Sequence, residues 1–159
     1  MTVKILCGIV IVIACSTVGM KISNMMVQRV RSLGGFLSAL AKMEGSIETV
    51  LMPLDEIYRE LSGMKGKVGE FFSKLSPGCD WKKHLSFFPE LTEQDKAIIV
   101  NMSEKLGEFE SERQLKEIRL AQNLLEQALS GAKEEVAMNA KVYRSMSFFA
   151  GVVIAILLI

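Results

Sequence analysis

Uncharged apolar segments stand at both ends of the chain, and the region between them mixes charged with apolar residues. The first segment, Ile5–Met20, is bracketed by Lys4 and Lys21 and has about the length of a membrane-spanning helix. The second, SFFAGVVIAILLI, closes the chain. The pattern predicts an N-terminal transmembrane helix, a middle domain and a C-terminal transmembrane helix, over residues 1–20, 21–145 and 146–159.

The closing segment is short for a membrane span when it is taken alone. A helix over Met146–Ile159 rises roughly 21 Å, whereas the hydrocarbon core of a bilayer is about 30 Å thick. From about Ser111 onward, however, apolar residues keep a helical spacing and no proline interrupts them. We therefore expect one long helix that is already formed when it enters the membrane.

Helical periodicity also runs through the middle domain. Apolar residues recur at intervals of three, four and seven along one predicted face, namely Leu33, Leu37, Leu40, Ile47 and Leu51. Glycines at positions 34, 35 and 45 permit a bend in that helix. Because no stretch alternates as a strand would, the predicted fold class is all-α, with a helical bundle as the soluble part.

Local signals predict where shorter helices begin. Pro53 is placed as the first residue of a helix over PLDEIYREL, and Asp80 as the cap of DWKKHLSFF. Thr92 and Asp95 resemble a capping box, with a helix that Gly107 closes. GMKGKVG is interpreted as a linker, since it lacks the spacing and the hydroxyl residue of a phosphate-binding loop.

Basic residues flank the middle domain at both predicted membrane junctions. No Asp or Glu occurs between Met1 and Met43. The flanking basic residues are Lys21, Arg29, Arg31, Lys42, Lys141 and Arg144. Positive flanks predict that the middle domain lies in the cytoplasm. The net charge of only +1 argues against a nucleic-acid-binding protein.

The residue inventory predicts no catalytic, cofactor-binding or metal site. His84 is the single histidine of the chain, so a site with several histidine ligands is excluded. Cys7 and Cys15 lie in the first apolar segment and leave Cys79 alone in the middle domain. We therefore expect a protein that is not an enzyme and needs no cofactor.

A cleaved signal sequence is the alternative to the first anchor. VIAC, at Val12–Cys15, resembles a bacterial lipoprotein cleavage box. The chain would then be an exported, lipoprotein-like structural module of the envelope, with a lipid on Cys15. This alternative places Cys79 outside the cell, whereas a retained anchor places it inside.

An ordered set of residues follows the pattern of a known family. In the first half these are Leu37, Leu40, Glu44, Ile47, Pro53, Leu54 and Glu56. In the second half they are Leu106–Glu108, Gln114, Ile118, Leu120, Leu125, Glu126, Ala132, Lys141, Tyr143 and Gly151. Together with the two apolar ends, they resemble the stage III sporulation protein AB family. Ser46 departs from the pattern, which has an acidic residue before Ile47.

The resemblance implies a place in the mother-cell membrane that surrounds the forespore, with the soluble domain in the cytoplasm. It implies a bundle of about six helices, similar to domains of the type II secretion F protein. Members of the family are expected to act as a platform in a secretion-like channel assembly. The expected partners are a cytosolic ATPase, the stage III sporulation AA protein, and other proteins of that assembly; self-association stays open.

Glu44 lies within the predicted apolar stripe, between Leu37 and Leu51 on the helical wheel. A carboxylate at such a position requires a partner. Two hypotheses follow. Glu44 forms an ion pair with a base of the long C-terminal helix, the candidates being Arg113, Lys116 and Arg119. Alternatively Glu44, with Glu48 one turn later, contacts a basic face of the ATPase.

Overall fold

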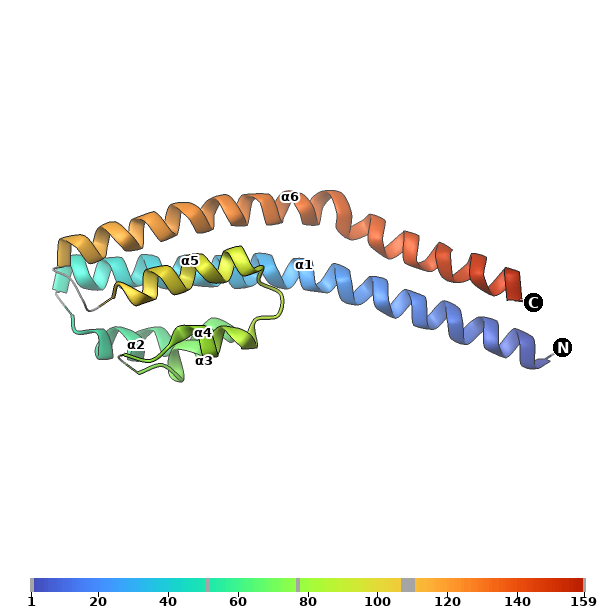
Figure 1. Cartoon of the computed structure of the whole chain (residues 1–159), viewed down its shortest axis with the longest axis horizontal. Coiled ribbons are helices and arrows are strands. Elements are labelled where there is room, and N and C mark those ends of the chain that lie inside the picture. Colours follow the sequence, from blue (N-terminus) through green and yellow to red (C-terminus); the bar gives the residue numbers. More distant parts are fainter. Residues whose placement is uncertain (1, 51, 77, 107–110, 159) are drawn as a thin grey trace. The chain divides into compact units, whose positions relative to one another are not determined.

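The computed structural model describes residues 2–50, 52–76, 78–106 and 111–158 (Figure 1). Within them are six α-helices and one 3₁₀ helix, and no strand occurs in these ranges. The elements are α1 (Thr2–Val50), α2 (Leu54–Ser62), α3 (Lys67–Ser73), α4 (Trp81–His84), η1 (Leu85–Phe87), α5 (Glu93–Glu104) and α6 (Ser111–Leu158). The all-α prediction is confirmed.

The helix start signals read from the sequence are mostly confirmed. The Asp95 backbone N–H donates to Thr92 Oγ1 at 3.2 Å, and the Thr92 N–H donates to Asp95 Oδ2 at 3.0 Å. These two bonds form the predicted capping box of α5. At α4, Asp80 Oδ1 accepts a hydrogen bond from the Lys82 N–H at 3.0 Å. Short-range donors and acceptors therefore fix both helix starts.

Two local predictions were wrong by one or a few residues. Pro53 is the N-cap of α2 and not its first helical residue, because its ψ of 149° keeps it extended. The linker ends earlier than expected, since α3 already begins at Lys67, with Gly66 as N-cap at a φ of 94°. Leu51 and Gly107 lie outside the described residues.

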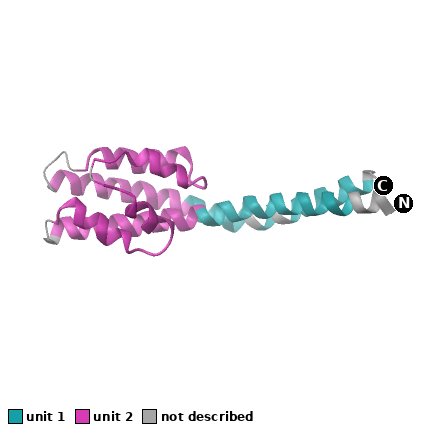
Figure 2. Cartoon of the chain, turned by 90° about the horizontal axis from the view of Figure 1, so that it is seen from below, with its two compact units in different colours: residues 1–28, 131–159 teal, residues 29–130 magenta. Residues whose placement is uncertain are grey.

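The chain divides into two compact units, shown in Figure 2. Unit 1 comprises Met1–Gln28 and Gly131–Ile159, and unit 2 comprises Arg29–Ser130. Both boundaries fall inside a long helix, α1 or α6.

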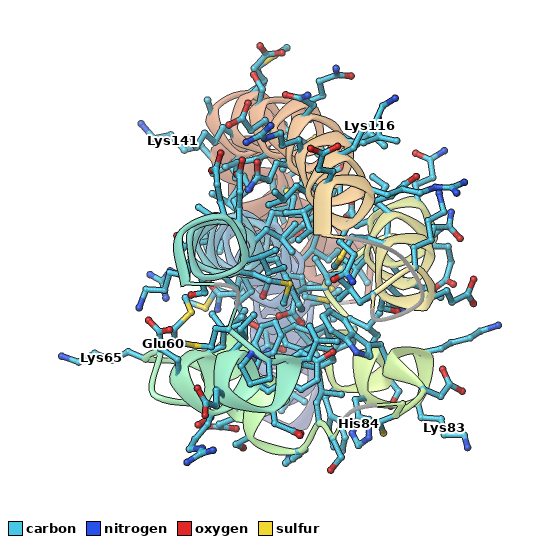
Figure 3. All side chains as sticks on the ribbon, turned by 90° about the vertical axis from the view of Figure 1, so that its left-hand side faces the viewer. Glu60, Lys65, Lys83, His84, Lys116 and Lys141 are labelled. Carbon is cyan, nitrogen blue, oxygen red and sulfur yellow. The ribbon has the colours of Figure 1, made fainter. Side chains whose placement is uncertain are left out.

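Unit 2 is a helical bundle in three layers. Figures 1 and 3 show its part of α6 on one side, α2, α3 and α4 on the opposite side, and its part of α1 with α5 between them. The predicted face of α1 turns to the core, since Leu33, Leu40 and Ile47 are buried, while Leu37 is half-buried. Burial of this face drives the assembly of the layers.

An aromatic cluster occupies the side of this core between α1 and the α2–α4 layer. The Phe71 ring centroid lies 5.4 Å from Phe36, 5.4 Å from Trp81 and 5.8 Å from Phe88. All three pairs meet edge to face, which adds roughly 0.5–1.5 kcal/mol per pair beyond area burial. Phe71 therefore joins α3 to α1, to α4 and to the segment after η1.

Unit 1 is a pair of helical segments that meet through small residues. A Cβ added at Gly19 would lie 2.9 Å from the Tyr143 carbonyl oxygen and closer still to Ser147. One added at Gly151 would lie 3.1 Å from Val12 Cα and 3.0 Å from Cys15 Cβ. The two backbones thus approach so closely that a larger side chain would separate them.

The outer surface of unit 1 carries its large apolar side chains. Exposed residues on the two segments include Ile9, Val10, Ile13, Val18, Phe148, Phe149, Val153 and Ile156. Within the described residues, one helix, over Gly8–Glu48 of α1, is long and apolar enough to cross a membrane by length and composition. This finding is consistent with a membrane-associated protein.

Gly35 and Gly45 of α1 differ in the space available for an added methyl group, so they form a matched pair for mutation. At Gly35 an added Cβ lies 2.8 Å from Cγ2 of the buried Val68, whereas at Gly45 nothing lies within 4 Å. We expect Gly45→Ala to stabilise the protein by about 0.5–1 kcal/mol. Gly35→Ala should destabilise it by about 1–3 kcal/mol, because the β-branched Val68 cannot move aside easily. Denaturant unfolding of the full chain in a mild detergent, followed by circular dichroism, measures both; equal stability would contradict the packing of α1 against α3.

Candidate functional site

Glu44 and Glu48 on α1 meet Arg119 and Gln122 on α6 at the surface of unit 2. Arg119 Nε donates to Glu44 Oε1 at 2.5 Å, and Arg119 Nη2 donates to Glu48 Oε1 at 3.3 Å. Gln122 Nε2 donates to the second oxygen of Glu44 at 3.0 Å. We call these four residues the acidic–arginine cluster.

The ion pair predicted for Glu44 is confirmed, with Arg119 as its partner. The pair is not buried, however, because the Glu44 side chain is 20% exposed and the Arg119 side chain is 52% exposed. Glu44 lies at the edge of the apolar face of α1, next to α6 and partly exposed to solvent. The hydrogen bonds from Arg119 and Gln122 lower the pKa of Glu44, so it is held as a carboxylate.

Glu48 is the more available carboxylate of the cluster. Its side chain is 57% exposed, and its contact with Arg119 is the longer of the two. Figure 3 shows Lys116, another basic residue of α6, projecting from the outer side of that helix. The cluster therefore presents fixed, partly solvated charges, a surface that can contact a charged partner.

An ion pair between Arg29 and Asp95 joins α1 to α5 inside unit 2, and the sequence had identified only Asp95. Arg29 Nε donates to Asp95 Oδ2 at 2.8 Å, and Arg29 Nη2 donates to Oδ1 at 3.1 Å. The Asp95 side chain is only 2% exposed. The capping-box pattern identified Asp95, but no local signal connects it with Arg29. Asp95 thus serves as a helix cap and as one half of a bidentate ion pair.

Glu90 links α1 to α3, and no pattern in the sequence indicated that it would be buried. Its Oε1 accepts hydrogen bonds from Ser32 Oγ at 2.7 Å and from Lys67 Nζ at 3.0 Å. The Glu90 side chain is 1% exposed, and its Oε2 has no hydrogen-bond partner among the described residues. Such a group costs free energy, which the two bonds to Oε1 partly offset.

The pKa values of both buried carboxyls are lowered. Burial has the largest influence and by itself raises the pKa of Asp95, but the hydrogen bonds from Arg29 and Thr92 together outweigh it. The same balance holds the pKa of Glu90 below its ordinary value, with Ser32 among the donors and Lys67 adding charge. Both groups therefore stabilise the fold as anions.

His84 lies against Cys79, with 3.4 Å between Nε2 and Sγ. Among the described residues there is no group of three or more histidine, cysteine or acidic side chains placed to hold a metal ion. Of the clusters in unit 2, the acidic–arginine cluster combines exposed acidic and basic groups, whereas Asp95 and Glu90 are enclosed.

Comparison with known proteins identifies the family. The family model for stage III sporulation protein AB matches residues 4–159. The chain belongs to the stage III sporulation protein AB family. It is 26% identical to Stage III sporulation protein AB of Bacillus subtilis (strain 168), over an alignment of 168 positions that covers 98% of each chain. No solved structure matches.

Membership of the stage III sporulation protein AB family supports a sporulation-related function. The match spans both units and includes Glu44, Glu48 and Arg119. The similarity to type II secretion F domains, which the resemblance to this family implied, stays a prediction.

Asp95→Asn tests the buried ion pair of this family member. We expect a loss of roughly 1.5–3 kcal/mol at neutral pH, the range for a hydrogen bond to a charged group. Because the folded pKa is below the ordinary 3.8, the unfolded chain binds more protons near that pH. The contribution of Asp95 is therefore complete above about pH 4 and is lost as the pH falls through its lower, folded pKa.

Denaturant unfolding at a series of pH values measures the difference between wild type and variant. The difference should shrink as the medium becomes acidic. Glu126→Gln, at an exposed position of α6, is the control and should leave the pH dependence unchanged. A pH-independent difference would mean that the ionised form of Asp95 contributes nothing to stability.

Proposed function

We propose that the chain is a non-enzymatic membrane scaffold of a sporulation-specific, secretion-like channel assembly between mother cell and forespore. In this proposal unit 1 is the anchor, and unit 2 docks a cytosolic secretion-type ATPase of the stage III sporulation AA type. Family membership supports the setting. The observation that carries the membrane role is the outward display of large apolar side chains by unit 1.

The packing of unit 1 is suited to lipid and not to water. Buried positions include Gly8, Gly19 and Ser23 on α1 and Gly151 and Ala155 on α6. Helices in membranes associate through such small residues, because lipid already solvates the larger apolar ones. The arrangement supports two transmembrane segments, near residues 1–20 and 146–159, that pair with each other.

The length of α6 supports the second segment despite the short apolar tail. The helix has 48 residues and continues from unit 2 to Leu158. Its backbone hydrogen bonds are thus made within the helix before it would enter lipid, as a membrane requires.

The contacts of Val12 favour a retained anchor over a lipoprotein. An added methyl at Gly151 would meet Val12 and Cys15 together, so the two residues line one contact. Cleavage before Cys15 would remove Val12 and half of that contact. The basic residues at the junctions then support a cytoplasmic unit 2.

The acidic–arginine cluster is the proposed docking surface for the ATPase. Glu44 is held by Arg119 and Gln122, while Glu48 keeps most of its side chain in solvent. A basic face of the ATPase would pair with Glu48 and with the remaining acceptor capacity of Glu44. Association of this kind is steered by charge and weakens with salt.

Val153→Arg tests the C-terminal anchor. The Val153 side chain is 56% exposed, so the change should leave the interior of unit 1 intact. Arginine near the centre of a span costs about 2.5–3.5 kcal/mol on insertion scales. In protoplasts of vegetative cells that express the chain with an epitope tag after Ile159, we expect antibody to reach the tag from outside in wild type and in Val153→Leu, but not in Val153→Arg. A tag that antibody cannot reach in wild type would contradict a tail that crosses the membrane, and a tag equally accessible in Val153→Arg would contradict a span with Val153 near its centre.

Glu48→Lys tests the docking surface. Reversing this charge should weaken capture of the stage III sporulation AA ATPase at least about tenfold, because a like-charge contact costs more than 1.4 kcal/mol. Thermal unfolding should barely change, since Glu48 is largely exposed. Glu93→Lys makes the same charge change at a 90% exposed side chain on α5, away from the cluster, and should bind normally. Equal capture by both variants would remove the cluster from the interface.

A further inference from the structure

A cavity of about 230 Å³ lies in unit 2 between α3 and the segment formed by α4, η1 and Phe88. Its inner wall includes Phe71 and Phe88, two side chains of the aromatic cluster that are almost fully buried. The cavity is smaller than the roughly 300–1,000 Å³ of pockets that enclose a whole small molecule. Its size suits one apolar side chain.

Phe87 forms an exposed aromatic edge of the same cavity. Its side chain is 61% exposed, in contrast with its buried neighbour Phe88. Lys74 Nζ lies 4.5 Å from the centroid of the Phe87 ring, so a cation stands over this ring. An exposed aromatic beside an apolar cavity is the kind of surface that a partner covers.

Lysines are the more numerous of the charged side chains that line the cavity. Lys67 and Lys74 line it against one acidic lining residue, Glu70. Lys67 is held in place by the buried Glu90 carboxylate, at 3.0 Å. Lys74, by contrast, forms no ion pair with any carboxylate in the described part of the chain, and so is available to an anion.

Further basic groups stand beside the cavity on α4. Lys82 and Lys83 immediately precede the lining residue His84, and both are exposed. Figure 3 shows Lys83 and His84 near each other at the edge of unit 2. An acidic occupant would therefore meet attraction from two elements, α3 and α4.

We propose that this cavity binds an acidic segment of a partner protein by taking up one of its apolar side chains, of aromatic size or smaller. The apolar side chain packs against Phe71, Phe87 and Phe88. A neighbouring carboxylate of the segment pairs with Lys74. Aromatic anchors of this kind dominate binding when the surrounding charges are complementary.

The cavity is separate from the acidic–arginine cluster. The cavity belongs to the layer of α2, α3 and α4, whereas the cluster joins α1 to α6, on the other side of unit 2 (Figures 1 and 3). Unit 2 thereby presents an acidic site to a basic partner and a basic, apolar site to an acidic partner. The inference does not depend on docking of the ATPase.

Peptide binding to the full chain in nonionic detergent tests the proposal. The probe is fluorescein-labelled Glu-Asp-Phe-Asp-Glu-amide, followed by fluorescence anisotropy. The matched peptides are Gln-Asn-Phe-Asn-Gln-amide, which lacks the charge, and Glu-Asp-Ala-Asp-Glu-amide, which lacks the ring. We expect saturable binding of the probe, and at least about fivefold weaker binding of each matched peptide, the factor that corresponds to 1 kcal/mol.

Variants of the protein locate the site. Lys74→Glu and Phe87→Ser should each weaken binding of the probe at least about fivefold, on the same scale. Both side chains stand at the edge of the cavity, so unfolding by heat should be unchanged. Lys65→Glu is the control, because Lys65 lies in the turn before α3 and points away from His84 in Figure 3. The proposal is overturned by absent saturable binding, by equal binding of the three peptides, or by equal binding to the Lys65 and Lys74 variants.

Discussion

The edge-to-face packing of the Phe71 ring is the interaction on which unit 2 depends most. It joins Phe36 of α1, Trp81 of α4 and Phe88 after η1 to a single side chain of α3. α3 has only seven residues and could not persist alone in water. Its packing through Phe71 fixes where Lys67 and Lys74 stand, and thus forms the basic cavity.

Directional polar contacts select one arrangement from the many that apolar packing would permit. Burial of apolar area is not directional, so by itself it does not select one register of the helices. Arg29 with Asp95, and Ser32 and Lys67 with Glu90, hold α1 in register with α5 and α3. Removing one partner would leave a buried charge, and this penalty disfavours alternative registers.

The two units bury different kinds of side chain along the same two helices: large apolar ones in unit 2 and small ones in unit 1. In unit 2, α1 buries large residues such as Leu33, Phe36 and Leu40. In unit 1, α1 and α6 bury glycine and serine and turn Ile13, Val153 and similar residues outward. Water favours the first pattern, and lipid tolerates the second. The difference between the residues buried in the two units supports the membrane scaffold that we propose.

The sequence by itself determined what depends on neighbouring residues or on overall pattern. The all-α fold, the Thr92–Asp95 capping box and the family followed from periodicity, from contacts between residues three apart and from an ordered set of matching positions. The position of Glu44 in an apolar stripe indicated that this carboxylate needs a partner, and Arg119 was among the three bases named as candidates.

Only the tertiary structure decided which distant residues meet. Arg29 and Asp95 are 66 positions apart, and Arg119 and Glu44 are 75 apart. Glu90 is likewise buried where α1 and α3 meet the segment after η1, and the cavity beside Phe87 forms where α3 meets α4 and η1. A helical period records which face of a helix is apolar, but it holds no information about which other helix that face contacts, or at what register.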